Sequence, residues 1–266
     1  PTTGKIADDL SRRRGGRTEW GHPTHYCGCC HGTLVQAHSM HDTLLCHTDD
    51  AGLRVDQYFP FEARFVADGV PVTARVESVF RSWTVGEPTG PGHPWVHEAH
   101  RPGSWTFSVT ISAAKPVEFT LSLRRPEWLA HPMLTWIGKD GPREAEAGIG
   151  YERIRRVWQD DTVFVELPLS LRAEPLPDEP DTVAFLDGPI VLAGLCDCER
   201  ALIGDPARPT DLLRPNADGD GYPWGSAYRS VDQPTGTRFI PLHAVVDEPY
   251  SIYFPIVRRW SSDLTA

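Results

Sequence analysis

Apolar and polar residues alternate along much of the chain, and this period of two is typical of β-strands that bury one face. The alternation predicts strands at residues 53–59, 72–77, 105–111, 117–123 and 162–167. Lys115-Pro116 interrupts the pattern, so we expect 105–111 and 117–123 to be consecutive antiparallel strands. Gly and Pro at the turns and the scarcity of helical periods favour a β-sandwich.

The C-terminal part of the chain continues this pattern. Residues 183–195 form a further apolar run that Asp187-Gly188-Pro189 interrupts. A last strand pair is predicted at 239–246 and 250–257. Between them, residues 199–237 are rich in Gly, Pro and Asp, which predicts a long surface loop.

One segment has a helical period instead. Apolar positions between residues 32 and 47 fit one face of a helix about four turns long, with Thr33 as its N-cap. Residues 1–26 are polar and have no clear period, which is typical of loops. We therefore divide the chain into residues 1–55, the C-terminal end of a helical catalytic domain, and residues 56–266, a β-sandwich accessory region.

The composition excludes several kinds of partner. The formal net charge of −10 over 266 residues leaves no basic stripe for nucleic acid. No apolar run approaches the roughly 20 residues that span a bilayer, so no membrane is expected. The six cysteines do not form a disulfide framework, which favours reduced thiols and the cytoplasm.

Three of the six cysteines lie together in Cys27-Gly28-Cys29-Cys30, just before the predicted helix. Thiolates are zinc ligands and nucleophiles, and a helix N-terminus or a bound cation favours the anion. Zinc normally takes four ligands, so others would come from His22, His25, His31 or residues outside the chain. Three buried, inert cysteines are the alternative interpretation.

The tryptophans and the acidic pairs have simpler explanations. Aromatic rings serve as sugar-stacking platforms, but packing in the core or at sheet edges is the favoured interpretation here. Packing is the interpretation that we favour for Trp83, Trp95, Trp105, Trp128, Trp136 and Trp158. Asp49-Asp50 and Asp160-Asp161 have the sequence context of solvated turns.

Several segments, in order, give the chain a resemblance to glycoside hydrolase family 127, the β-L-arabinofuranosidase type. The run from Cys29 to His38 is the first of these segments. The others are residues 49–58, 119–128, 150–163, 187–194 and 241–254, so that the resemblance spans about residues 25–257.

This resemblance implies an (α/α)6 barrel followed by β-sandwich domains. It also implies a retaining mechanism in which Cys29 is both the nucleophile and a Zn²⁺ ligand, with Cys30 as a second ligand. The remaining zinc ligands, a Glu and a Cys, and the general acid/base Glu would lie upstream of Pro1. The chain would then be a C-terminal fragment, inactive alone.

The resemblance further implies an arabinose-containing oligosaccharide or glycan as substrate, and a homodimer is among the expected assemblies. Some family members have Pro-Pro-Asn after the paired cysteines, whereas this chain has His31-Gly32-Thr33. The exact sugar therefore stays open. Two alternatives are a non-catalytic carbohydrate-binding or interface module and a purely structural zinc site.

Overall fold

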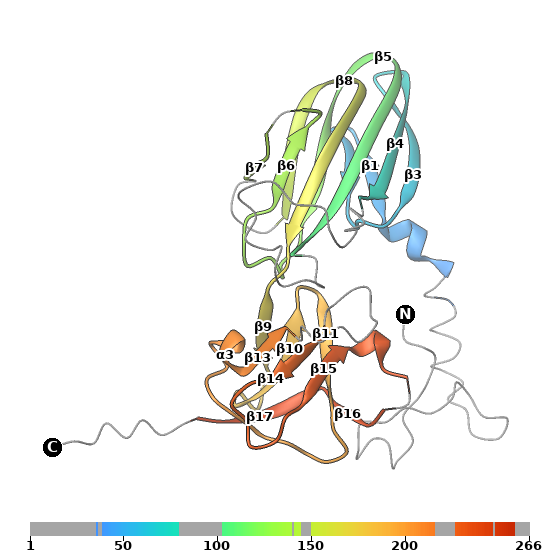
Figure 1. Ribbon diagram of the computed structural model, residues 1–266. Helices are drawn as coiled ribbons and strands as arrows, with labels where there is room; N and C mark the ends of the chain where they lie inside the picture. The colour runs from blue at the N-terminus through green and yellow to red at the C-terminus, as the bar shows by residue number, and fades with distance from the viewer. Residues whose placement is uncertain are drawn as a thin grey trace, which may run out of the picture. The chain divides into compact units, whose positions relative to one another are not determined.

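The computed structural model describes residues 36, 39–79, 103–139, 141–144, 150–215, 227–246 and 248–258. The chain divides into two compact units between Leu169 and Ser170 (Figure 1). We call the described residues up to Leu169 the first unit and those from Ser170 onward the second unit. Both are built mainly from strands, so the predicted mainly β fold is confirmed.

The first unit begins with a short 3-10 helix, η1 (His41–Leu44), and continues as one eight-stranded sheet in the order β1-β2-β5-β8-β6-β7, with β4 also on β5 and β3 on β4. The strands are β1 (Cys46–Asp49), β2 (Gly52–Val55), β3 (Phe61–Ala67), β4 (Val70–Ser78), β5 (Ser104–Arg125), β6 (Leu134–Ile137), β7 (Arg143–Glu144) and β8 (Gly150–Pro168).

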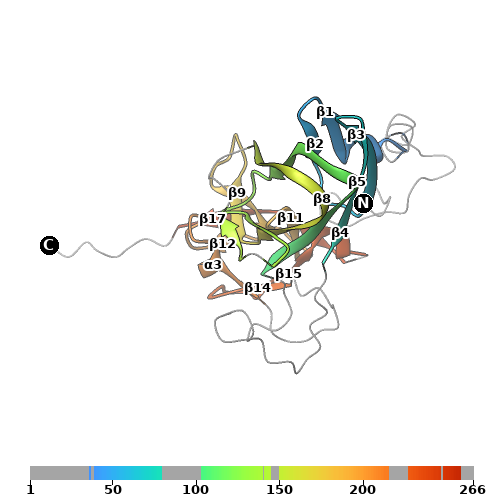
Figure 2. The ribbon, with the colours of Figure 1, turned by 90° about the horizontal axis from the view of Figure 1, so that it is seen from above.

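Two long antiparallel strands, β5 and β8, form the centre of this sheet, and both bend at the upper end of the unit in Figure 1. Strand β4 pairs with the first half of β5, and β2 runs parallel to the second half. Strand β6 pairs with the second half of β8. Seen from above, β5 and β8 again lie side by side (Figure 2).

The prediction of two consecutive antiparallel strands at 105–111 and 117–123 is wrong, because both segments belong to β5. The register of β5 against β8 shifts between Ser112 and Val117, and the intervening residues, including Pro116, form an irregularity. Proline has no backbone N–H to donate to a neighbouring strand, and none is needed where the pairing is irregular. The strand therefore continues through the proline instead of ending at it.

Alternate residues of these strands form the core of the first unit. Leu121, Val163 and Trp158 are fully buried. The indole Nε1 of Trp158 donates to the carbonyl oxygen of Phe119 at 2.9 Å, which satisfies its one polar atom. Core packing of Trp158 is thus confirmed.

The helix predicted over residues 32–47 is wrong at its C-terminal end, where the chain enters β1 at Cys46. Cys46 packs against the core of the first unit, and β1 pairs with β2. The Asp49 carboxylate closes the turn between them by accepting from the backbone of Ala51 at 2.9 Å and Gly52 at 3.1 Å. Residues 46–55 thus belong to this sheet and not to a helical barrel, whereas a barrel formed by the residues before the described ones stays a prediction.

The second unit forms a nine-stranded sheet in the order β12-β17-β10-β11-β15-β14-β13, with β9 on β10 and β16 on β11. Its elements are β9 (Leu171–Pro175), β10 (Thr182–Asp187), β11 (Ile190–Leu195), β12 (Leu202–Ile203), α3 (Pro209–Leu212), β13 (Leu213–Pro215), β14 (Tyr228–Ser230), β15 (Arg238–Pro241), η3 (Leu242–Ala244), β16 (Tyr250–Ser251) and β17 (Tyr253–Val257).

Three buried phenylalanines, Phe185, Phe239 and Phe254, form the centre of the second unit, with ring centroids 5.0–6.4 Å apart. Gly194 lies against two of these rings, and a Cβ there would come within 2.4 Å of Phe254. The glycine is therefore required for this packing.

Two predictions for the second unit need correction. The predicted loop at 199–237 contains β12, α3, β13 and β14, because scattered apolar residues such as Leu202 and Leu212 are buried. The segments at 239–246 and 250–257 contain strands, but β15 pairs with β11 and β14, and β17 pairs with β10 and β12. Long-range pairing of this kind leaves no local sequence signal. Among the described helices, none has the length and apolarity needed to cross a membrane.

Candidate functional site

The predicted thiolate site lies outside the described residues. Cys27, Cys29 and Cys30 all precede residue 36, so the predicted nucleophile and its companion ligand stay predictions. The histidines nearest to them in sequence, His22, His25 and His31, also lie outside. Within the described ranges, no group of three or more His, Cys, Asp or Glu residues is placed to hold a metal ion.

The three described cysteines are free thiols in ordinary surroundings. Cys46 is partly buried, and burial together with the charge of Asp56 raises the pKa of its thiol. Burial likewise raises the pKa of the Cys196 thiol, whose Sγ lies 3.5 Å from the carbonyl oxygen of Gly194. A raised pKa keeps a thiol protonated and a poor nucleophile, so neither residue replaces Cys29 as a candidate.

A polar cluster in the first unit surrounds the carboxylate of Asp56, which follows β2. His47 Nδ1 on β1 lies 2.5 Å from Asp56 Oδ2, and the Tyr151 hydroxyl on β8 donates to Asp56 Oδ1. Arg54 Nε lies 3.2 Å from the same Oδ1. The guanidinium of Arg54 also lies over the Tyr151 ring, 5.5 Å from its centroid.

These contacts keep Asp56 ionised. Partial burial raises its carboxyl pKa, but the hydrogen bonds from Tyr151 and His47 and the charge of Arg54 outweigh burial, so the pKa lies below its ordinary value. The hydrogen bond to Asp56 raises the pKa of the Tyr151 hydroxyl. A carboxylate whose oxygens already have three partners holds a structure together and is poorly placed to exchange protons.

A partly buried tyrosine, Tyr58, adjoins this cluster. Burial raises the pKa of Tyr58, and its hydroxyl donates to the carbonyl oxygen of Arg124 at 2.8 Å. The Tyr58 ring stacks on Phe107 with centroids 5.1 Å apart. The hydrogen bond between Asp56 and Tyr151 joins residues 95 positions apart in sequence, so the sequence analysis placed the members of this cluster only in separate segments.

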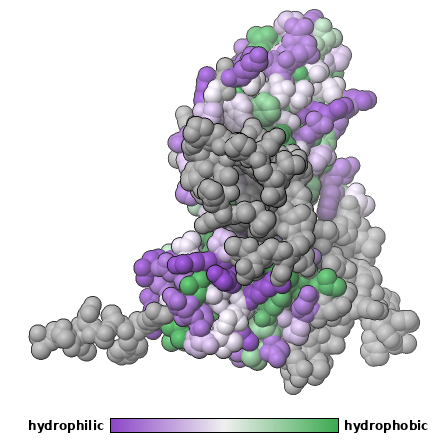
Figure 3. Space-filling view, viewed as in Figure 1, coloured by the Kyte–Doolittle hydropathy of each residue, from purple (hydrophilic) through white to green (hydrophobic). Residues whose placement is uncertain are grey.

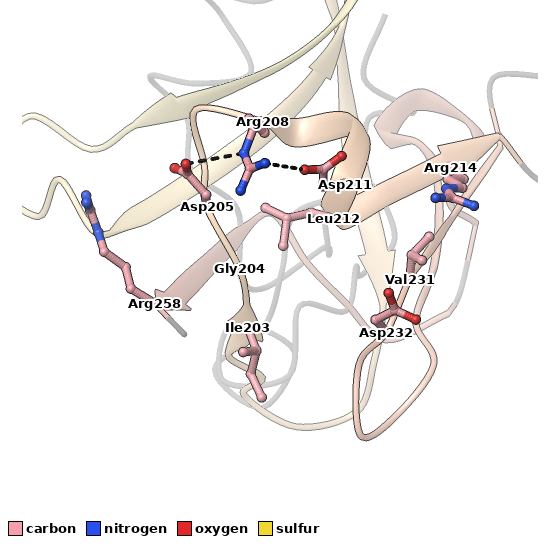
Figure 4. Close-up of a pocket in the computed structure, with 10 residues that line it drawn as sticks. All are labelled: Ile203, Gly204, Asp205, Arg208, Asp211, Leu212, Arg214, Val231, Asp232 and Arg258. Atoms are coloured by element: carbon pink, nitrogen blue, oxygen red, sulfur yellow. Dashed lines mark ion pairs between the residues drawn. The ribbon is translucent and has the colours of Figure 1, made fainter. Parts of the chain in front are cut away.

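The second unit has a polar hollow of about 420 Å³ beside α3 (Figure 4). Arg208 lies between two carboxylates there, with Asp205 at 3.6 Å and Asp211 at 3.3 Å. None of the residues that line it is aromatic. Because these ion pairs are exposed and no ring offers a stacking surface, the hollow is a weak candidate for a sugar site.

The fold and these clusters define a pair of β units with no complete catalytic centre among the described residues. The family model for the GH127 middle domain of β-L-arabinofuranosidases matches residues 94–169. Most of that segment is the β5–β8 part of the first unit. The resemblance to glycoside hydrolase family 127 is therefore confirmed.

Solved structures extend the likeness in fold to almost the whole chain. A GH127 β-L-arabinofuranosidase from Geobacillus stearothermophilus T6 is 19% identical with a TM-score of 0.65, over 96% of this chain and 42% of that one. A GH127 β-arabinofuranosidase is 18% identical with a TM-score of 0.62, over 91% and 40%. A glycoside hydrolase is 16% identical with a TM-score of 0.63, over 96% and 44%.

The chain thus spans less than half the length of these relatives. A search of curated proteins returned no match.

Proposed function

We propose that this chain is the C-terminal part of a retaining glycoside hydrolase that releases β-L-arabinofuranose-like sugars from a glycan. The observation that supports this most strongly is the match of residues 94–169 to the GH127 middle domain. The likeness in fold over 96% of the chain to a GH127 β-L-arabinofuranosidase supports it further.

In the proposed reaction, the Cys29 thiolate attacks the anomeric carbon while the glycosidic C–O bond breaks. The leaving oxygen takes a proton from a carboxylic acid outside this chain. Water then attacks the same carbon from the opposite side, gives a proton to that carboxylate, and the Cys29 thiolate leaves. Two inversions give net retention, with a thiolate in the place of the usual carboxylate nucleophile.

The donor chemistry of the cysteine pair fits zinc, which binds thiolates well. Cys29 and Cys30 would supply two of the usual four ligands, and a Glu and a Cys outside this chain would supply the others. Bound zinc would hold the sulfur as a thiolate at neutral pH.

The direct test uses the full-length parent protein with an aryl β-L-arabinofuranoside. We expect Cys29→Ser to lower kcat by roughly 10⁴-fold or more, as loss of a covalent nucleophile does. Cys27→Ser is the matched control and should keep near-normal activity, because Cys27 has no assigned role. Turnover that survives Cys29→Ser would exclude Cys29 as the nucleophile.

Zinc content and folding distinguish the catalytic interpretation from its alternatives. The parent should bind zinc stoichiometrically, and Cys30→Ser should reduce that binding while circular dichroism still shows folded protein. A parent without zinc would favour a carbohydrate-binding module. Loss of activity that only follows unfolding would favour a structural zinc site.

A further inference from the structure

One outer face of the first unit is polar and rich in arginine. Along β5, Leu121 and Leu123 are fully buried, so their neighbours Ser122 and Arg124 lie on the opposite face of the sheet. Along β8, Arg153 and Arg155 are exposed in the same alternation. Figure 3 shows hydrophilic residues over much of the described surface of this unit.

Strand register places these residues next to one another. His47 is opposite Arg54, Arg54 is opposite Ser122, and Ser122 is opposite Arg153. This gives a row across four strands in which a serine hydroxyl lies between two arginines. Arg124 lies two residues from Ser122 on β5, so Arg54 and Arg153 are both its diagonal neighbours, at about 7–8 Å. We call Arg54, Arg124, Arg153 and Arg155 the arginine face.

Two of the four guanidiniums already have carboxylate partners. Arg155 Nη2 lies 3.0 Å from Glu118 Oε2, and Arg54 pairs with Asp56. No ion pair joins Arg124 or Arg153 to a carboxylate within the described ranges of the chain. Like charges held this close repel one another, and a bound anion would relieve that repulsion.

We propose that the arginine face binds a polysaccharide that carries carboxylate groups, such as a chain of uronic acids. Guanidinium forks match carboxylates in two-point geometry. The Ser122 hydroxyl lies on the same face and is suited to sugar hydroxyls. The four guanidiniums of this face outnumber the carboxylates of Asp56 and Glu118 that pair with them, so its local charge is positive although the chain has a net charge of −10.

The choice of a polysaccharide over an acidic protein rests on the proposed glycan-processing function. The binding site itself does not depend on that function, because binding is measured without turnover. A failed activity test and a failed binding test are therefore distinguishable.

The test measures binding of polygalacturonate to residues 1–266 by affinity electrophoresis and calorimetry. We expect binding that weakens as ionic strength rises. Arg124→Gln with Arg153→Gln should weaken it by roughly tenfold, since two charge-assisted contacts are lost. Arg64→Gln is the matched control, because Arg64 is an exposed arginine on β3 that pairs with Glu62 at 2.7 Å. It should leave binding unchanged.

Three outcomes would overturn the proposal. The first is no binding of polygalacturonate by the wild-type chain, and the second is equal binding of a neutral arabinan. The third is equally tight binding of polyglutamate with the same sensitivity to the double substitution, which would assign the face to an acidic protein.

Discussion

Asp56 shows how a single carboxylate connects three strands of the first unit. Its oxygens contact His47 on β1 and Tyr151 on β8, while Arg54 on β2 lies 3.2 Å away. The hydrogen bonds of His47 and Tyr151 are strong because the acceptor is charged, and each contributes roughly 1.5–3 kcal/mol, whereas Arg54 acts through its charge. The carboxylate therefore stabilises the sheet chiefly when it is ionised.

Asp56→Asn should lower the free energy of unfolding at pH 7 by about 1–3 kcal/mol, because His47, Arg54 and Tyr151 lose their anionic partner. The folded-state pKa of Asp56 is lowered, so its contribution is present above the unfolded pKa of about 3.9 and lost as pH falls through the folded value. The difference from wild type should thus be constant at neutral pH and disappear in acid.

Urea unfolding followed by circular dichroism at several pH values measures this difference. Asp50→Asn is the control, because Asp50 is an exposed turn residue. Its substitution should change stability little at any of these pH values. A gap between Asp56→Asn and wild type that persists unchanged in acid would contradict the assigned role.

At the scale of elements, the parallel pairing of β2 with β5 depends on a close backbone approach. Gly52 has φ +144°, and a Cβ at this position would lie 2.4 Å from the carbonyl oxygen of Thr120. Thr120 is also its register partner on β5. Backbone atoms cannot move aside as a flexible side chain can, so only glycine fits.

Gly52→Ala should therefore destabilise the first unit by about 3 kcal/mol or more, from combined steric and backbone strain. Gly141→Ala is a matched control in the same unit, where a Cβ would meet nothing within 4 Å. It should be close to neutral. Thermal unfolding of both variants tests this, and equal melting temperatures would contradict the close approach.

Sequence reasoning found elements where the local period was strong and missed those set by distant partners. Alternation located β4, most of β5 and the last part of β8, and an apolar run located the two strands around Asp187. It divided β5 at Pro116, because no local signal shows that β8 continues as a partner on both sides. It also extended the helix to residue 47, where pairing with β2 overrides the helical pattern.

Candidate functional residues were predictable from the sequence only where they are adjacent in the chain. The cysteine cluster is visible because its residues are adjacent in sequence, yet its geometry lies outside the described residues. The Asp56 cluster and the arginine face are the reverse case. Their members come from four strands, and only the register of β1, β2, β5 and β8 brings them together.

At the scale of the whole molecule, the chain spans less than half of its structural relatives. If the proposed function is right, residues 1–266 hold the nucleophile and two zinc ligands, but the proton donor and the other ligands lie elsewhere. We therefore expect this chain alone to show no turnover of an aryl β-L-arabinofuranoside, even though circular dichroism shows folded β units. Its affinity for zinc should also be far below that of the parent protein, because two thiolates complete only half of a tetrahedral shell. A chelator competition measures that affinity, with the parent protein as the positive control. Turnover by residues 1–266, or zinc affinity equal to that of the parent, would mean that this chain contains a complete site.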